Sequence, residues 1–144
     1  MNKVVYNNCY GGFGLSVKAV VHILRQDKPD IKVFLYKRHL NSNILKKCDI
    51  EEAELVFLKD FGDFFDYNEV DNIETTTYML LYRLFTSRHD PKLIKAVEEL
   101  GKEASSPFAD LRIAEIDSDR YIIREYDGSE SVITPDKIDW IKIE

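Results

Sequence analysis

The sequence predicts an α+β fold, with two helices packed on a mostly antiparallel β-sheet in a single domain covering residues 1–144. Two segments, at 16–26 and 91–100, repeat apolar residues at helical spacing. Three shorter segments, at 111–116, 121–126 and 131–133, have the composition of strands and follow one another without a helix between them. Consecutive strands of this kind pair antiparallel, which favours α+β over a parallel α/β arrangement.

Both helices have clear start signals. Ser16 precedes the apolar positions of the first helix and is a suitable N-cap, because its hydroxyl can accept a bond from a free N–H group of the first turn. Asp90 is the predicted N-cap of the second helix. Pro91 then takes the first helical position, where its missing N–H costs nothing. Gly101 follows the last apolar position and is expected to end or interrupt this helix.

The remaining segments are predicted from alternation and turn residues. We expect strands at 3–6, 31–36 and 53–58, and at 75–85, where a helix is the alternative. Residues 39–52 are polar and are predicted to form a loop. Asp127-Gly128 predicts a tight turn between the last two strands. Residues 138–143 alternate and are predicted to add an edge strand.

Residues 60–74 interleave acidic and aromatic side chains. Carboxylates this close together raise the question of a calcium loop, but the spacing of a calcium-binding loop and its closing bidentate glutamate are missing. An acidic, aromatic surface loop is the preferred interpretation. We therefore predict no metal site.

Composition limits the classes of partner. The formal net charge of −6 argues against a nucleic-acid polymer as the main ligand, because such binding depends on neutralising many phosphates. No apolar run has the length of a membrane span, and the sequence shows no signal peptide. Cys9 and Cys48 lack the spacing of a metal or redox motif. These features predict a cytoplasmic protein that binds no membrane.

The segment at 8–16, NCYGGFGLS, is the most informative for function. Its three glycines lie between a predicted strand and the capped start of a helix, a geometry that presents backbone N–H groups to an anion such as phosphate. Asn8, Tyr10 and Phe13 add an amide and two rings, as expected beside a base or ribose. The segment is no dinucleotide fingerprint, because Val17 stands where the third glycine would fall. A purely structural glycine-rich turn is the alternative.

The sequence offers no convincing catalytic set. Cys9, His89 and Asp90 are formally a nucleophile, a base and an orienting acid, but Asp90 is already predicted to be a helix cap. Structural roles are favoured for all three, so we predict that the protein is not an enzyme and needs no cofactor. Arg88 is a candidate partner for phosphate, since arginine binds phosphate oxygens bidentately.

The NCYGGFGLS segment resembles the N-terminal signature of a family of small, largely uncharacterised phage and prophage proteins. Weaker signatures of that family recur at 88–93, 97–101 and 125–128, whereas residues 39–76 match nothing recognisable. Small acidic phage proteins with a ligand pocket include anti-defence proteins that sequester nucleotide immune signals, such as those of the Thoeris system. The resemblance thus implies a phage origin and, by analogy, signal sequestration by a homo-oligomer.

The leading functional hypothesis is a non-catalytic phage protein that binds and sequesters a cyclic ADP-ribose-type signal or a cyclic oligonucleotide. Two alternatives are a protein that binds a host protein through an exposed aromatic loop at 61–67, and a metal-dependent nucleotide hydrolase. The predicted ligand-binding residues come from the glycine-rich segment and three later segments: Asn8, Tyr10, Gly11, Gly12, Phe13, Gly14, Ser16, Arg88, Glu125, Tyr126 and Asp127.

Overall fold

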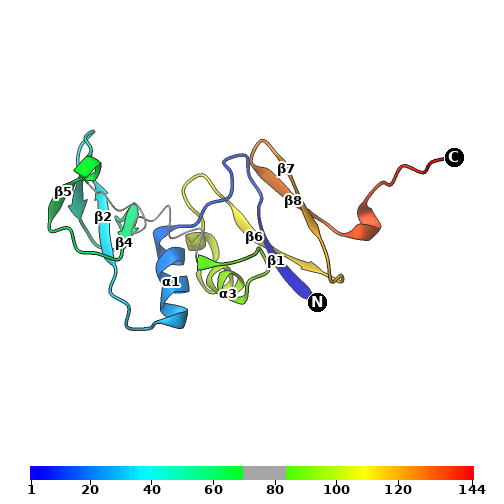
Figure 1. Ribbon diagram of the computed structural model, residues 1–144, viewed down its shortest axis with the longest axis horizontal. Helices are drawn as coiled ribbons and strands as arrows, with labels where there is room; N and C mark the ends of the chain where they lie inside the picture. Colours follow the sequence, from blue (N-terminus) through cyan, green and yellow to red (C-terminus); the bar gives the residue numbers. More distant parts are fainter. Residues whose placement is uncertain (70–83) are drawn as a thin grey trace. The chain divides into compact units, whose positions relative to one another are not determined.

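A computed structural model describes residues 1–69 and 84–144 and divides the chain into two compact units (Figure 1). Unit 1 comprises Met1–Leu15 and Ser87–Glu144, and unit 2 comprises Ser16–Thr86. The α+β class is confirmed, and every strand pair in the described residues is antiparallel. These strands lie in three sheets. Most of the strand predicted at 75–85 lies outside the described residues.

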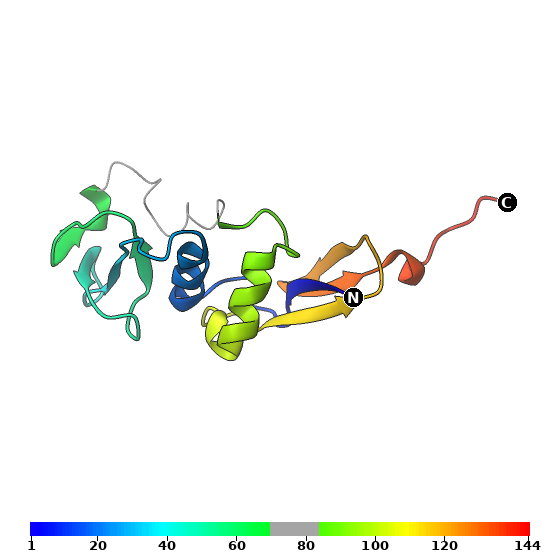
Figure 2. The same ribbon diagram turned by 90° about the horizontal axis from the view of Figure 1, so that it is seen from below.

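Unit 1 is built around β1 (Asn2–Asn7), which pairs along its whole length with β6 (Leu111–Ile116). The helix α3 (Pro91–Leu100) packs against both strands and continues into a 3-10 turn at Gly101–Ala104. A hairpin of β7 (Ile122–Tyr126) and β8 (Ser129–Ile133) places β8 beside β1, as both views show (Figures 1 and 2). Val4 and Val5 are both fully buried, so β1 is covered on both of its faces.

Unit 2 combines α1 (Val17–Asp27) with a four-stranded sheet. The strands are β2 (Phe34–Arg38), β3 (Ile44–Lys47), β4 (Leu55–Phe57) and β5 (Phe64–Asp66), in the spatial order β4-β2-β3-β5, and a 3-10 turn at Tyr67–Glu69 follows. The apolar face of α1 contacts β4. Central to the sheet is Tyr36 on β2, which is fully buried beside Leu45 and Phe57.

The local start and turn signals are confirmed. The Ser16 hydroxyl accepts a bond from the Ala19 N–H at 3.1 Å, and the Asp90 carboxylate accepts one from the Lys92 N–H at 2.9 Å. Gly101 follows α3 with a φ of +59°. Each helix therefore begins where a side chain replaces a missing backbone partner.

Three segment predictions need correction. The polar stretch at 39–52 contains β3, which pairs with β2 and β5 on either side. Lys28 accepts a bond from the Ile31 N–H in a turn, so β2 begins at Phe34 rather than at 31. The alternating stretch at 138–143 forms no strand, and Ile141 and Ile143 are 94% and 99% exposed. Alternation predicts a strand only where a neighbouring strand supplies hydrogen bonds.

The aromatic residues at 61–67 do not form a surface loop as predicted. Phe61 and Phe65 stack with ring centroids 4.6 Å apart and pack on the buried cluster around Tyr36. Only Phe64 and Tyr67 are substantially exposed, at 53% and 40%. This packing explains why so many rings occur in a short stretch, since they fill the core of a small sheet.

The Tyr36 hydroxyl closes this core over residues 60–62. It donates to the Gly62 carbonyl at 2.9 Å and accepts from the Phe61 N–H at 3.0 Å. Burial raises the pKa of this hydroxyl. The buried side chain therefore acts as a neutral hydrogen-bond donor and acceptor.

We expect Tyr36→Phe to lower the free energy of unfolding by about 1–2 kcal/mol, because two backbone groups lose their partner. Urea unfolding followed by circular dichroism measures the loss. Tyr67→Phe is the matched control, because the Tyr67 side chain is 40% exposed. Equal stability of the two variants would contradict the role given to the buried hydroxyl.

Candidate functional site: the glycine loop and the hairpin turn

A buried carboxylate organises one end of unit 1. Glu130 on β8 is 7% exposed and forms a bidentate ion pair with Arg88, with N–O distances of 2.6 and 2.9 Å. Its Oε1 atom also accepts the backbone N–H of Asn7 at 2.8 Å. The Arg88 guanidinium lies 3.7 Å from the centroid of the Phe13 ring. The cost of burying the Glu130 carboxylate is offset by its ion pair with Arg88 and by the hydrogen bond from the Asn7 N–H.

The side chain of Asn7 makes a second set of bonds at the same place. Asn7 is fully buried, and its amide N–H₂ group donates to the carbonyls of Cys9 and Gly128 at 2.8 and 2.9 Å. Its carbonyl accepts from the Asp110 N–H at 2.8 Å. One side chain thus ties the end of β1 to the start of β6 and to the turn of the β7–β8 hairpin. Such a fully bonded polar group fixes one arrangement of the segments it joins.

The glycine loop, residues 8–14, follows directly and is packed closely against neighbouring segments of unit 1. A Cβ atom added at Gly11 would collide with the Phe108 carbonyl, and one added at Gly14 would collide with the Ser106 hydroxyl. A Cβ at Gly128 would collide with the Tyr10 carbonyl and approach the Gly12 nitrogen to 2.7 Å. Gly11 and Gly128 are required by close backbone approach, whereas Gly14 leaves room for the Ser106 side chain. The loop and the hairpin turn are therefore in contact. A single site made of the ligand residues predicted in the loop and in the hairpin requires this contact.

The hairpin turn has the conformation that its sequence predicts. Asp127 and Gly128 have φ values of +50° and +90°, the positive values that a two-residue hairpin turn needs. Successive residues of a strand point to opposite faces, so Glu125 and Tyr126 on β7 do not share a face. Arg124, which is exposed, shares the face of Tyr126.

Three large rings are exposed around this contact. Tyr10, Phe108 and Tyr126 are 70%, 76% and 78% exposed. Tyr10 is in the loop, Phe108 is in the segment that Gly11 packs against, and Tyr126 directly precedes the turn. We call these three residues the aromatic cluster. Exposed rings on adjoining segments are typical of a binding surface.

Two predicted ligand residues have other roles in the structure. The charge of Arg88 is compensated by Glu130, so a phosphate would have to compete with a bidentate carboxylate. Ser16 belongs to unit 2, where it caps α1. Asn8, Tyr10, Gly11, Gly12, Phe13 and Gly14 lie in the loop, with Tyr126 and Asp127 in the adjoining hairpin and Glu125 on the other face of β7.

Cys9, His89 and Asp90 each engage a different partner. The Cys9 thiol lies 3.1 Å from the Phe108 carbonyl, Nδ1 of His89 lies 2.8 Å from the Tyr121 hydroxyl, and Asp90 caps α3. None of these contacts joins two members of the formal triad. The geometry therefore gives no support to nucleophilic catalysis by this set.

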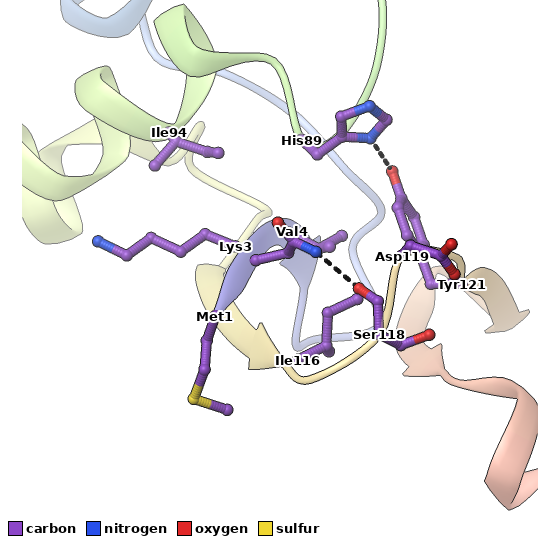
Figure 3. Close-up of a pocket in the computed structure, with 10 residues that line it drawn as sticks. Met1, Lys3, Val4, His89, Ile94, Ile116, Ser118, Asp119 and Tyr121 are labelled. Atoms are coloured by element: carbon purple, nitrogen blue, oxygen red, sulfur yellow. Dashed lines mark hydrogen bonds between the residues drawn. The ribbon is translucent and has the colours of Figure 1, made fainter.

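A cavity of about 420 Å³ lies elsewhere in unit 1, at the opposite end of β1 (Figure 3). It is lined by residues of β1, of α3 and the segment just before it, and of the end of β6 and its connection to β7, among them Lys3, His89, Ile94 and Tyr121. None of the predicted ligand residues is among its lining residues. Figure 3 shows the hydrogen bond between His89 and Tyr121 at one side of this cavity.

Comparison with protein-family models, with curated proteins and with solved structures finds no match for this chain. Within residues 1–69 and 84–144, no group of three or more histidine, cysteine or acidic side chains could hold a metal ion. In the same part of the chain, no helix is long and apolar enough to cross a membrane.

Sequence reasoning missed Asn7, Glu130 and Phe108. Glu130 carries a usable signal, because alternation along β8 places it on the same face as Val132. A carboxylate at an inward position of a strand requires a buried partner. Nothing in the sequence identifies Arg88, 42 residues away, as that partner.

We expect Glu130→Gln to lower the free energy of unfolding by about 3 kcal/mol, because it leaves a largely buried arginine without its counter-charge. Chemical denaturation measures this loss. Glu98→Gln is the matched control, because the Lys3–Glu98 pair is exposed at both ends. Its removal should cost less than about 1 kcal/mol. Similar losses in the two variants would show that Glu130 has no special structural role.

The close approach of the loop and the turn gives a second prediction. Gly128 and Gly12 have almost the same φ, +90° and +87°, but only Gly128 is crowded. Gly128→Ala should therefore destabilise the protein by about 1–3 kcal/mol more than Gly12→Ala, which measures the collision alone. Thermal unfolding of both variants tests this difference. A smaller loss for Gly128→Ala than for Gly12→Ala would refute the packing argument.

Proposed function

We propose that this protein binds a nucleotide-type ligand without transforming it, at the surface formed by the glycine loop, the hairpin turn and the aromatic cluster. The observation that supports this most is that three exposed rings are carried by segments whose backbones meet at glycines, namely Gly11 against Phe108 and Gly128 against Tyr10. Exposed rings offer flat faces on which a base can stack, and such stacking tolerates different bases.

The phosphate contacts in this proposal come mainly from groups other than Arg88. Backbone N–H groups of a glycine-rich loop suit an anion. Gly12 is the open position of this loop, since a Cβ added there would meet nothing within 4 Å, whereas Gly11 and Gly14 are packed against other residues. Arg124 is exposed on the face of β7 that carries Tyr126, so it offers a cation beside a stacking ring. Arg88 acts indirectly, since its pairing with Glu130 and its contact with Phe13 hold the loop in place.

The more specific role is sequestration of a nucleotide immune signal by a phage-encoded protein. The resemblance of residues 8–16 to phage proteins motivates this role, with a cyclic ADP-ribose isomer or a cyclic oligonucleotide as the ligand. Sequestration requires only tight binding, which matches a surface made of rings, backbone N–H groups and one cation. In this proposal the protein forms homo-oligomers and acts in the cytoplasm of the host cell.

Binding by an aromatic loop at 61–67 is less well supported. Phe61 and Phe65 fill the core of unit 2, so this segment offers only Phe64 and Tyr67 to a partner. The metal-dependent hydrolase has no specific observation in its favour.

A thermal-shift screen tests the proposal with ADP-ribose, its cyclic isomers, cyclic di- and trinucleotides and NAD, each with and without magnesium. A ligand at a hundredfold excess over its dissociation constant should stabilise the fold by about 2.7 kcal/mol, which raises the melting temperature by several degrees. We expect at least one of these compounds to raise the melting temperature in this way. The bound compound, released by heating, should have an unchanged mass. Turnover that depends on magnesium would contradict sequestration.

Variants locate the binding surface. Tyr10→Ala and Tyr126→Ala should each weaken binding at least tenfold, consistent with about 1–3 kcal/mol for a stacked base. Both side chains are largely exposed, so their removal should leave the fold intact. Trp140→Ala is the control, because that ring is 72% exposed in the C-terminal segment. Full affinity in both tyrosine variants, or no ligand in the whole panel, would overturn the proposal.

A further inference from the structure

The cavity of about 420 Å³ shown in Figure 3 is not explained by the surface proposed above. It is lined by the first residues of β1, whereas the glycine loop follows the last residue of that strand. At a rise of about 3.3 Å per residue, the five residues from Lys3 to Asn8 separate the two places by roughly 16 Å. The cavity volume lies within the range of small-molecule sites.

The floor of this cavity is apolar and comes from three elements. Val4 on β1 is fully buried, Ile116 at the end of β6 is 9% exposed, and Ile94 lies on the first turn of α3. Figure 3 shows the three side chains around the start of β1. Small-molecule sites are lined mainly by apolar side chains such as these, against which a planar ring can pack.

One wall is a histidine–tyrosine pair. His89 Nδ1 lies 2.8 Å from the Tyr121 hydroxyl, and the two rings meet edge to face with centroids 5.6 Å apart. Burial raises the pKa of the Tyr121 hydroxyl, so it keeps its proton at neutral pH. The hydrogen bond fixes both rings. They present polar atoms at a defined place beside an apolar floor.

The ionised lysine and carboxylate side chains at the cavity each have a partner of opposite charge. Lys3 forms a 2.8 Å ion pair with Glu98, and that hydrogen bond raises the pKa of Lys3. Asp119 pairs with Arg120 at 3.2 Å and is 84% exposed. Among the described lining residues, no lysine or carboxylate side chain is therefore left uncompensated, and the remaining charge is the amino group of Met1, a residue that is 80% exposed to solvent.

We propose that this cavity is a second binding site, for an uncharged planar heterocycle of nucleoside size. The ring lies on Val4, Ile94 and Ile116, and its hydrogen-bonding edge faces the His89–Tyr121 pair. This inference is independent of the function proposed above, because it uses none of the residues of that surface.

The test is an NMR titration of the full chain with adenosine, guanosine, cytidine and uridine, and with AMP as the charged counterpart of adenosine. We expect a saturable change at the His89 imidazole and the Ile94 and Ile116 methyl groups for at least one nucleoside. The His89 signal is identified by its loss in His89→Gln. AMP should bind at least tenfold more weakly than adenosine.

Two variants and one control locate the binding. Ile94→Trp fills the cavity and should weaken nucleoside binding at least tenfold, and Tyr121→Phe should weaken it about fivefold by removing the hydroxyl alone. Tyr121→Phe remains informative where the larger substitution prevents folding. Phe64→Ala, in unit 2, should bind as the unaltered chain does. The proposal is overturned by the absence of saturable change with all four nucleosides, by undiminished affinity in Tyr121→Phe, or by equal affinity for AMP.

Discussion

The buried carboxylate of Glu130 is the constraint on which the arrangement of unit 1 depends. A charge that is only 7% exposed needs compensation, and Arg88 and the Asn7 N–H supply it from two separate parts of the chain. Asn7 is the last residue of β1 and Arg88 lies just before α3, so their bonds to Glu130 bring both segments to β8. The Asn7 side chain then joins the hairpin turn and the start of β6 to the same point. The ends of four segments are thus fixed together by polar bonds.

This arrangement explains why the loop at residues 8–14 is rich in glycine. Glycine at 11 and 128 allows backbone to lie against backbone, and glycine at 14 leaves room for the Ser106 side chain, so the glycine-rich composition has a structural cause before any ligand is considered. The same close packing leaves the rings of Tyr10, Phe108 and Tyr126 at the surface. A rigid contact that carries exposed rings is a suitable base for recognition, because little order remains to be lost when a ligand binds. The structural and the binding interpretations of the loop therefore support each other.

Local signals made much of the fold predictable from the sequence. Ser16, Asp90 with Pro91, and Asp127 with Gly128 act through their immediate neighbours, and all three predictions are confirmed. Pairing between distant segments was not predictable. Residues 44–47 form a strand because β2 and β5 lie on either side, although two of these four residues are lysines. Residues 138–143 have better alternation and no strand, since pairing rather than pattern decides.

The candidate site was predictable in part for the same reason. The loop and the hairpin were identified from their own residues, and the structure brings Tyr10 and Gly12 against Gly128. The partner of Arg88 was not identified, because an ion pair across 42 residues leaves no local pattern. The cavity beside His89 was missed as well. Its lining comes from segments far apart in the sequence, none of which is unusual by itself.

Amide hydrogen exchange in the unaltered chain and in Glu130→Gln tests the central claim most directly. The carboxylate network should protect the Asn7 N–H, which donates to Glu130, and the Asp110 N–H, which donates to Asn7. We predict that exchange at these two amides becomes at least tenfold faster in Glu130→Gln, while amides of β2 and β3 in unit 2 keep their rates. Unchanged protection of Asn7 and Asp110 in that variant would contradict the account.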